Sequence, residues 1–395
     1  MSKITPPVGY GRQWIDEADR EAVLAVLSGD MLTQGPAVEA FERTVAKYVN
    51  AKHAIAVSSG TAALHIACMA ADLGPGDIAA VPTLTFVATA NAARYCGAEA
   101  AVLDVDRESL SLTAAQLGPF LQNNPHAKAV LPVHFAGLSA GLAELRKVAG
   151  ERIIIEDACH ALGGRYEDGQ MIGSCAHSDM AVFSFHPVKP ITTGEGGMIT
   201  TNDDELARKL KMFRSHGIER DPARFVGALK DELGPWGYEQ QTLGFNYRLS
   251  DLQAALGTSR MSKLDGFLER RRAIAAYYDD RFSGLEHVSS VQHDPASRVR
   301  SGHHLYVVEV DFAALGTTRT DVMAQLRDLG VGTQVHYIPV HRQPYHQASG
   351  DLQTQDFPNA ESYYAGALTL PFFPAMTDDN MRDVADNICA VLGAP

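Results

Sequence analysis

Seven short apolar runs, separated by longer helical stretches, constrain the fold of this chain more than any other feature. Runs this short that are apolar nearly throughout are typical of strands buried on both faces, as in a parallel sheet covered by helices. The sequence therefore predicts an α/β fold with a large, mostly parallel sheet flanked by helices. The runs lie at 54–57, 78–81, 100–104, 129–133, 152–155, 180–185 and 197–200.

Helical patterns on both sides of this region indicate how the chain is divided. The longest pattern begins at Ser250-Asp251, a suitable N-cap, and continues to 282. We therefore predict a large domain over 1–254, which includes an N-terminal helical segment, and a smaller C-terminal α+β domain over 255–395. Helices are expected at 15–28, 37–49, 250–282, 319–329 and 377–392, a strand at 305–310 and a loop-rich insertion at 220–243.

The charge balance and the cysteines limit the partners and the compartment. With Lys+Arg 34 and Asp+Glu 47, the net charge is −13, which disfavours nucleic acid and anionic membranes as partners. Five cysteines without a C-x-x-C pair are expected to be reduced thiols, not disulfides or zinc ligands. The N-terminus has no apolar signal-peptide segment, and the longest charge-poor stretch, 54–71, is interrupted by polar residues. We expect a cytoplasmic enzyme.

Two strand ends present groups that suit a phosphorylated aromatic ligand. Ser58-Ser59-Gly60-Thr61 joins a predicted strand to a helix, and free N–H groups at a helix start form an anion site. An ordinary capped turn would have the same sequence. Pro82-Thr83-Leu84-Thr85-Phe86 brings an aromatic side chain to the same sheet edge, although this segment taken alone favours a core position for Phe86.

Two further strand ends carry ionisable groups. Asp157, in Glu156-Asp157-Ala158-Cys159-His160, follows a buried run, where it either binds a ligand or caps the next helix. Cys159 is interpreted as a small buried residue, because no Cys–His–Asn arrangement accompanies it. Lys189 lies in the apolar stretch 183–190, where desolvation would lower its pKa and make it an amine nucleophile. The alternative is a lysine that reaches solvent from a loop.

Together these groups match the requirements of pyridoxal phosphate. That cofactor needs an amine for its aldehyde, an acid at its ring nitrogen, an anchored phosphate and an aromatic stack. Asp157 and Lys189 are 32 residues apart, and each follows one of two consecutive apolar runs. A metal site is not expected, since His303, His304, His336, His341 and His346 lack H-x-x-x-H spacing with an adjacent general base.

The ordered motifs of the chain resemble those of the DegT/DnrJ/EryC1/StrS family of sugar-nucleotide aminotransferases, which are fold type I pyridoxal-phosphate enzymes. The resemblance covers nearly the whole chain, from Tyr10-Gly11-Arg12-Gln13 to Leu370-Pro371-Phe372-Phe373-Pro374. Its motifs include S-S-G-T-A-A-L-H, E-D-A-C-H-A-L-G, F-S-F-H-P-V-K, G-E-G-G-M-I-T-T and G-F-N-Y-R-L-S-D. F-S-F-H-P-V-K-P-I-T-T, F-R-S-H-G-I and E-D-A-C-H look most like the pseudaminic-acid branch.

The resemblance implies roles for individual residues. Lys189 would form the Schiff base and serve as general base and acid, and Asp157 would pair with the pyridinium nitrogen. His160 stands where many members carry Gln and would lie near the cofactor 3-oxygen. The remaining cofactor contacts implied are Phe86 on the ring, Gly60, Thr61 and Ser184 on the phosphate, and Asn246, or else Arg248, from the partner subunit of a homodimer.

The resemblance also implies the reaction. Glutamate would donate its amino group to the C4 ketone of a UDP-linked 4-keto-6-deoxy-N-acetylhexosamine of the L-altrosamine type. Another nucleotide-sugar C4 or C3 aminotransferase, using dTDP-, GDP- or UDP-4-amino-arabinose-type sugars, remains an alternative, as does a regulator that binds the cofactor without turnover. A related dehydratase is disfavoured, because histidine replaces the lysine there. Because the chain is acidic, discrete contacts must hold a diphosphate; the candidates are Arg214, His216, His336, Tyr337, His341 and Arg342.

Overall fold

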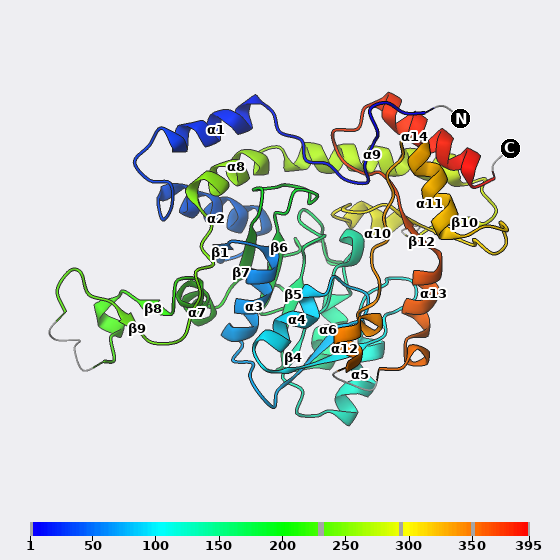
Figure 1. Cartoon of the computed structure of the whole chain (residues 1–395). Coiled ribbons are helices and arrows are strands. Elements are labelled where there is room, and N and C mark those ends of the chain that lie inside the picture. The colour runs from blue at the N-terminus through cyan, green and yellow to red at the C-terminus, as the bar shows by residue number, and fades with distance from the viewer. Residues whose placement is uncertain (1–2, 228–232, 292–294, 349–351, 394–395) are drawn as a thin grey trace.

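The computed structural model describes residues 3–227, 233–291, 295–348 and 352–393, and its centre is a seven-stranded sheet (Figure 1). The strand order is β1-β7-β6-β5-β4-β2-β3, in which β7 runs antiparallel to β1 and β6 and the other pairs are parallel. Each predicted run contributes one strand, which confirms the mostly parallel sheet. The strands are β1 His53–Val57, β2 Ile78–Pro82, β3 Glu99–Leu103, β4 Ala129–Val130, β5 Ile153–Asp157, β6 Met180–Ser184 and β7 Gly197–Thr201.

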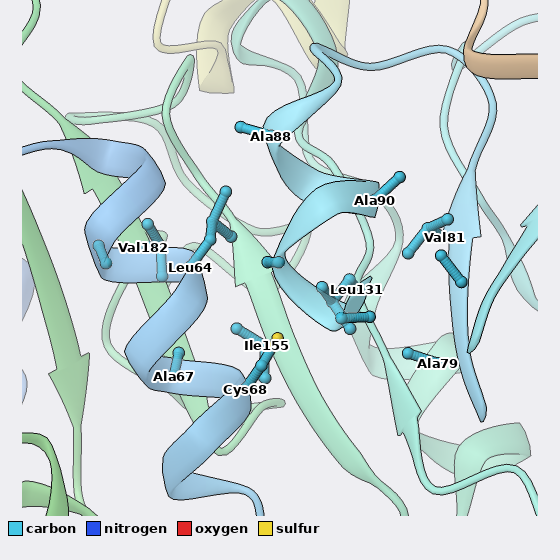
Figure 2. Close-up of a cluster of buried hydrophobic side chains, with 14 of the residues drawn as sticks. Leu64, Ala67, Cys68, Ala79, Val81, Ala88, Ala90, Leu131, Ile155 and Val182 are labelled. Atoms are coloured by element: carbon cyan, nitrogen blue, oxygen red, sulfur yellow. The ribbon is translucent and has the colours of Figure 1, made fainter. Parts of the chain in front are cut away.

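Helices cover both faces of this sheet because successive strand residues point to opposite sides. In β1, Ile55 and Val57 belong to one core cluster, whereas Ala54 and Ala56 belong to the other. Figure 2 shows the first cluster, in which Leu64 of α3 packs near Val182 and Ile155 of the sheet. On that side lie α3 Gly60–Ala70, α4 Ala88–Tyr95 and α7 Asp204–Arg214; on the other lie α2 Pro36–Val49, α5 Ala114–Asn123, α6 Leu142–Ala149 and α8 Asp251–Met261.

The predicted helical stretch at 250–282 forms two helices, α8 and α9 (Leu264–Phe282). Ser250 caps α8 as expected, in a capping box with Gln253. The break follows Met261: the Ser262 hydroxyl donates to the Ser259 carbonyl, and Lys263 pairs with carboxylates of the N-terminal segment. The predicted helix at 15–28 is α1 Glu17–Leu27, which packs on α8.

The C-terminal part has a small antiparallel sheet of its own, as the predicted α+β domain requires. Its strand order is β10-β11-β12, and helices pack on it around a third core cluster. Ile4 and Val8 also belong to this cluster, because the backbone of residues 4–8 bonds to that of 329–332. The division at 254/255 stays a prediction, but these N-terminal residues pack with the C-terminal part. Its elements are β10 Val288–Ser290, α10 Pro295–Arg300, β11 Val307–Val310, α11 Arg319–Asp328, α12 Pro344–Ala348, α13 Pro358–Gly366, β12 Ala367–Thr369 and α14 Asp378–Val391.

The predicted loop-rich segment 220–243 extends from the body of the molecule beside α7 (Figure 1). Its described residues include a single turn at Pro222–Arg224 and β9 Glu239–Gln240, which pairs with β8 Ile218–Glu219. Residues 228–232 of this prediction lie outside the described part. None of the helices in the described ranges is both long enough and apolar enough to cross a bilayer.

Candidate active site

A cavity of about 500 Å³ opens at the carboxyl-terminal edge of the large sheet, where β1, β2, β5 and β6 end. In open α/β sheets this edge is where ligands bind. One wall, called the sheet wall, comes from residues at or near the ends of the strands. The opposite wall comes from residues after position 300, and Tyr10 also lines the cavity. The cavity is lined by nine of the predicted site residues: Gly60, Thr61, Phe86, Asp157, His160, Ser184, Lys189, His336 and Tyr337.

The start of α3 forms one end of the cavity. Ser59 caps the helix, since its hydroxyl oxygen accepts the N–H of Ala62 at 3.0 Å. A Cβ on Gly60 would lie 2.9 Å from the Cβ of Ser184, so glycine lets the helix start lie directly against β6. The first N–H groups of a helix have no intrahelical acceptor and lie at the positive end of its dipole. With the hydroxyls of Thr61 and Ser184 beside them, they suit a phosphate.

Asp157 lies at the end of β5 with both carboxylate oxygens hydrogen-bonded. The Thr89 hydroxyl donates to Oδ2 at 2.6 Å, and the N–H of Cys159 donates to Oδ1 at 3.1 Å. The Thr89 hydroxyl uses its one hydrogen in the bond to the carboxylate. Its oxygen therefore accepts a hydrogen bond from the Thr85 hydroxyl at 2.8 Å. Cys159 is half-buried and lines the cavity, so the prediction of a buried core position is wrong. Desolvation raises the pKa of its thiol well above its usual value, which disfavours a thiolate nucleophile.

Lys189 follows β6 and brings its amine to a buried histidine. Its Nζ lies 3.5 Å from Nε2 of His304. Burial lowers the pKa of Lys189, while the nearby acidic groups of Cys159 and Asp157 oppose that shift. Burial and the charge of Lys189 lower the pKa of His304 well below its usual range, so the imidazole beside the amine is uncharged. Desolvation of this lysine is what its apolar sequence surroundings predict.

His160, His336 and Tyr337 form the rest of the inner surface. The ring centroid of His160 lies 4.4 Å from that of His304, and its Nε2 lies 2.9 Å from the Tyr337 hydroxyl. His336 bonds through Nδ1 to the Thr369 hydroxyl at 2.9 Å, and burial lowers its pKa to about 3. This surface therefore presents neutral hydrogen-bonding groups.

Phe86 lies at the mouth of the cavity and is 56% exposed. Its ring centroid is 6.1 Å from that of Tyr337. An exposed aromatic ring on a cavity wall is available to cover a planar ligand. The alternative interpretation of Phe86 as a core residue is wrong.

Four predicted residues lie beside the end of the edge strand β1 but do not line this cavity. The Arg214 guanidinium donates to Glu42 at 2.6 Å and to the Ala56 carbonyl at 2.9 Å, and His216 and Asn246 are exposed. Arg248 lies with Arg214 in a separate hollow of about 500 Å³. These four residues lie outside the lining of the cavity of their own chain.

His341 and Arg342 also lie away from the cavity. His341 is fully buried, with Nδ1 2.7 Å from the Thr83 hydroxyl and Nε2 2.7 Å from a carboxylate oxygen of Glu361. Arg342 donates to both oxygens of the same carboxylate. Glu361, on α13, thus engages both side chains, and the sequence gives no signal that connects it to this loop.

Glu156 points away from the cavity, since it precedes Asp157 on the same strand. Its carboxylate is fully buried and accepts hydrogen bonds from His134 Nε2 at 2.6 Å and from the Tyr166 hydroxyl at 2.7 Å. The charge of Glu156 adds to burial in raising the pKa of Tyr166 well above its usual value. This network anchors the loop after β4 behind the site.

Several residues of the cavity and its support were not among the predicted site residues. Thr85 and Thr89 had a detectable signal, because two threonines spaced by four follow a strand end and begin a helix. His304 had only its place in a His-His pair, which has no metal-site spacing. Tyr10 also lines the cavity from the N-terminal segment, and nothing in its local sequence predicts that location.

The chain is similar to proteins of one known family over nearly its whole length. Residues 13–389 match the model of the DegT/DnrJ/EryC1/StrS aminotransferase family. The chain is 38% identical over 383 residues to the spore coat polysaccharide biosynthesis protein SpsC of Bacillus subtilis, covering 96% of this chain and 95% of that protein. It is 34% identical over 388 residues to the UDP-4-amino-4,6-dideoxy-N-acetyl-beta-L-altrosamine transaminase of Campylobacter jejuni, covering 98% and 97%.

A solved structure has the same fold over nearly the whole chain. PseC of Helicobacter pylori, an aminotransferase involved in the biosynthesis of pseudoaminic acid, superposes with a TM-score of 0.87 at 26% identity, covering 98% of this chain and 99% of that one. The chain therefore belongs to the DegT/DnrJ/EryC1/StrS aminotransferase family. It is a pyridoxal-phosphate-dependent sugar aminotransferase, as its motifs predict.

The groups around the cavity fit pyridoxal phosphate. A half-buried amine and a hydrogen-bonded carboxylate line it, and an exposed aromatic ring lies at its mouth. The helix start at Gly60 provides a close backbone approach for a phosphate. The assignment of each residue to one part of the cofactor stays a prediction.

Proposed function

We propose that this enzyme transfers the amino group of L-glutamate to the C4 ketone of a nucleotide-linked 4-keto-6-deoxy sugar. The substrate is of the UDP-4-keto-6-deoxy-N-acetyl-L-altrosamine type, and the product is UDP-4-amino-4,6-dideoxy-N-acetyl-beta-L-altrosamine, of the pseudaminic acid pathway. The name of the Campylobacter jejuni relative supports this substrate, since that protein covers nearly the whole chain. The five free cysteines fit a cytoplasmic location.

The observation that carries this proposal is the Lys189 amine, which lies in the cavity beside Asp157 with an uncharged imidazole 3.5 Å away. When bound, the cofactor supplies a carbonyl that takes up the amino group and a ring that withdraws electrons from the carbon that loses its proton. Lys189, its pKa lowered by burial, takes that proton and returns it to the neighbouring carbon as general base and then acid.

Other residues hold the reactants in place. The Asp157 carboxylate, oriented by Thr89 and the N–H of Cys159, accepts the hydrogen of the protonated ring nitrogen. The start of α3, with Thr61 and Ser184, binds the phosphate. Phe86 covers one face of the ring.

We further propose that the active unit is a homodimer with shared sites. Asn246 is exposed and lies outside the cavity of its own chain, in the G-F-N-Y-R motif. In a two-fold dimer, each chain can supply this residue to the phosphate end of the other cavity, with Arg248 as the alternative. His336 and Tyr337 would contact the sugar.

A substrate panel tests the proposed reaction. The enzyme is incubated with glutamate and UDP-, GDP- or dTDP-linked 4-keto sugars, and the products are identified by mass spectrometry. The proposal expects a 4-amino product from the UDP-linked N-acetylated sugar at the highest kcat/KM. A higher kcat/KM for a dTDP- or GDP-linked sugar would contradict it. A cofactor absorption band that does not change with glutamate would instead favour a regulator without turnover.

Mixing two inactive variants tests the shared site. Lys189→Ala and Asn246→Ala chains are mixed under conditions in which differently tagged subunits are shown to exchange. Hybrid dimers contain one site with both residues intact, so activity returns. No recovery despite exchange would mean that Asn246 does not act across the subunit boundary.

A further inference from the structure

The backbone after β4 determines which nitrogen of His160 carries a proton. The N–H of Ala136 lies 3.3 Å from Nδ1 of His160. A backbone N–H can only donate, so Nδ1 must accept, and the proton of the neutral ring is on Nε2. Burial and the charge of Lys189 lower the pKa of His160 well below its usual range, so the ring is not doubly protonated.

The Ala136 N–H is held in this position from both sides. The Ala136 carbonyl accepts the N–H of His304 at 3.0 Å. His134, two residues before Ala136, is fully buried. Its Nδ1 accepts the N–H of Ala140, and its Nε2 lies 2.6 Å from a carboxylate oxygen of Glu156. Both contacts fix the loop backbone, so the N–H cannot turn away from His160 without breaking buried hydrogen bonds.

The same proton position orients the Tyr337 hydroxyl. The His160 Nε2–H faces this hydroxyl at 2.9 Å, so the phenol oxygen accepts that bond. Burial and the charge of Asp157 raise the pKa of Tyr337 well above its usual value, so the phenol keeps its own proton. Within the described residues no protein acceptor faces that proton, and Tyr337 lines the cavity.

We propose that Tyr337 donates a hydrogen bond to an oxygen atom of the ligand in this cavity, and that His160 is the positioning residue that turns the phenol proton toward it. This inference rests on the proposed function for the identity of the ligand. The acceptor is an oxygen next to the reacting carbon, on the cofactor ring or on the sugar. His160 then acts through Tyr337 and does not itself contact the cofactor oxygen, because its one N–H is already used.

The tautomer of His160 is measured first, on the wild-type holoenzyme. Nitrogen-15 NMR of histidine-labelled protein, with His160→Gln for assignment, distinguishes a protonated Nε2 from a protonated Nδ1. The proposal expects the proton on Nε2 throughout pH 6–8. A proton on Nδ1, or on both nitrogens, would overturn it. Neither this measurement nor cofactor binding needs a sugar, so their results are independent of the proposed substrate.

Removal of the phenol proton donor gives the second test. Tyr337→Phe keeps the ring and should keep the thermal midpoint. Loss of one hydrogen bond to a reacting oxygen should lower kcat by about tenfold. If the acceptor is on the cofactor, the Kd for pyridoxamine phosphate rises and both half-reactions slow; if it is on the sugar, only the sugar half-reaction slows. Unchanged binding and unchanged rates in both half-reactions would overturn the proposal.

Two amide variants at position 160 distinguish a positioning role of His160 from an effect of its side-chain size. A glutamine can reach Tyr337 with its terminal N–H, whereas an asparagine, one methylene shorter, cannot. His160→Gln should stay within about threefold of wild type and His160→Asn should lose about tenfold, as Tyr337→Phe does. Because the two residues act together, His160→Asn with Tyr337→Phe should be no worse than Tyr337→Phe alone. Losses that multiply in the double variant would show that His160 acts elsewhere.

Discussion

The two walls of the cavity are built in different ways and carry different chemistry. The sheet wall holds three charged residues: Asp157 at the end of β5, Lys189 in the turn after β6, and Glu195 just before β7. The opposite wall holds His304, His336 and Tyr337, which burial keeps neutral. The charged side chains thus lie close to the strand ends of the large sheet, whereas the side chains of the opposite wall are neutral hydrogen-bonding groups from loops.

Lys189→Ala removes the amine of the sheet wall and should have the largest effect. With no amine to move the proton, we expect kcat to fall at least about a thousandfold. Pyridoxamine phosphate should still bind, because the groups proposed for its phosphate remain; equilibrium dialysis and single-turnover rates measure both. Lys147→Ala, at an exposed pair with Glu144, is the control and should change neither value. Near-normal turnover in Lys189→Ala would contradict the mechanism.

Asp157→Asn tests a second charged group of that wall. A neutral amide cannot balance a protonated ring nitrogen, so we expect kcat to fall about a hundredfold or more, with a smaller change in KM for glutamate. Steady-state kinetics at several glutamate concentrations separate the two constants. Asp168→Asn, an exposed carboxylate outside the cavity, should behave as wild type. An unchanged kcat in Asp157→Asn would remove this residue from its proposed role.

Because His336 on the opposite wall is neutral, we expect the free energy of unfolding to depend on pH. The pKa of His336 is about 3 in the folded protein, against about 6.5 in the unfolded chain. Below pH 6.5 the unfolded chain binds this proton and the folded protein does not, so stability falls as the pH drops from about 6.5 toward 3. The slope is up to about 1.4 kcal/mol per pH unit for this one group.

Urea unfolding between pH 7.5 and 5 measures this slope, at fixed protein and cofactor concentrations. His336→Asn should flatten it by up to that amount, whatever its effect on stability at pH 7.5. His126→Gln, at an exposed position, serves as the matched control and should leave the slope unchanged. If His336→Asn and the wild type have the same slope, the neutral His336 does not lower the free energy of unfolding at acid pH.

Thr89→Val has the smallest expected effect, because it changes only the orientation of a group on the sheet wall. The variant keeps the shape of the side chain but removes the hydroxyl that donates to Asp157 at 2.6 Å. One lost hydrogen bond corresponds to about tenfold or less in kcat. Thr89→Ser retains the hydroxyl and should recover most of the rate. Equal losses in the valine and serine variants would indicate a packing effect.

The two walls also differ in how well the sequence predicts them. All seven strands of the large sheet were predictable because each is a short apolar run, and the residues that follow them meet at one edge. Lys189, Asp157 and the start of α3 share this local signal. His304 and Tyr10 reach the cavity through long-range packing, which no local pattern encodes. His341 and Arg342 were predicted near the substrate, but Glu361, distant in sequence, bonds to both.

The break between α8 and α9 shows the same limit on a smaller scale. Residues 250–282 are compatible with one continuous helix, and the Ser250 cap is evident from the sequence. The pairing of Lys263 with Asp16 and Asp19 involves the N-terminal segment and therefore depends on the tertiary fold. A local pattern predicts that helix forms there, but not where packing interrupts it.

The packing of Ile4 and Val8 with the C-terminal core has a consequence for biosynthesis. These residues are translated long before their partners, such as Leu326, Val331 and Ile388. This core can therefore be completed only after the later segments have been synthesised. Until then Ile4 and Val8 lack these partners, so substitutions at either residue should act on a late stage of folding.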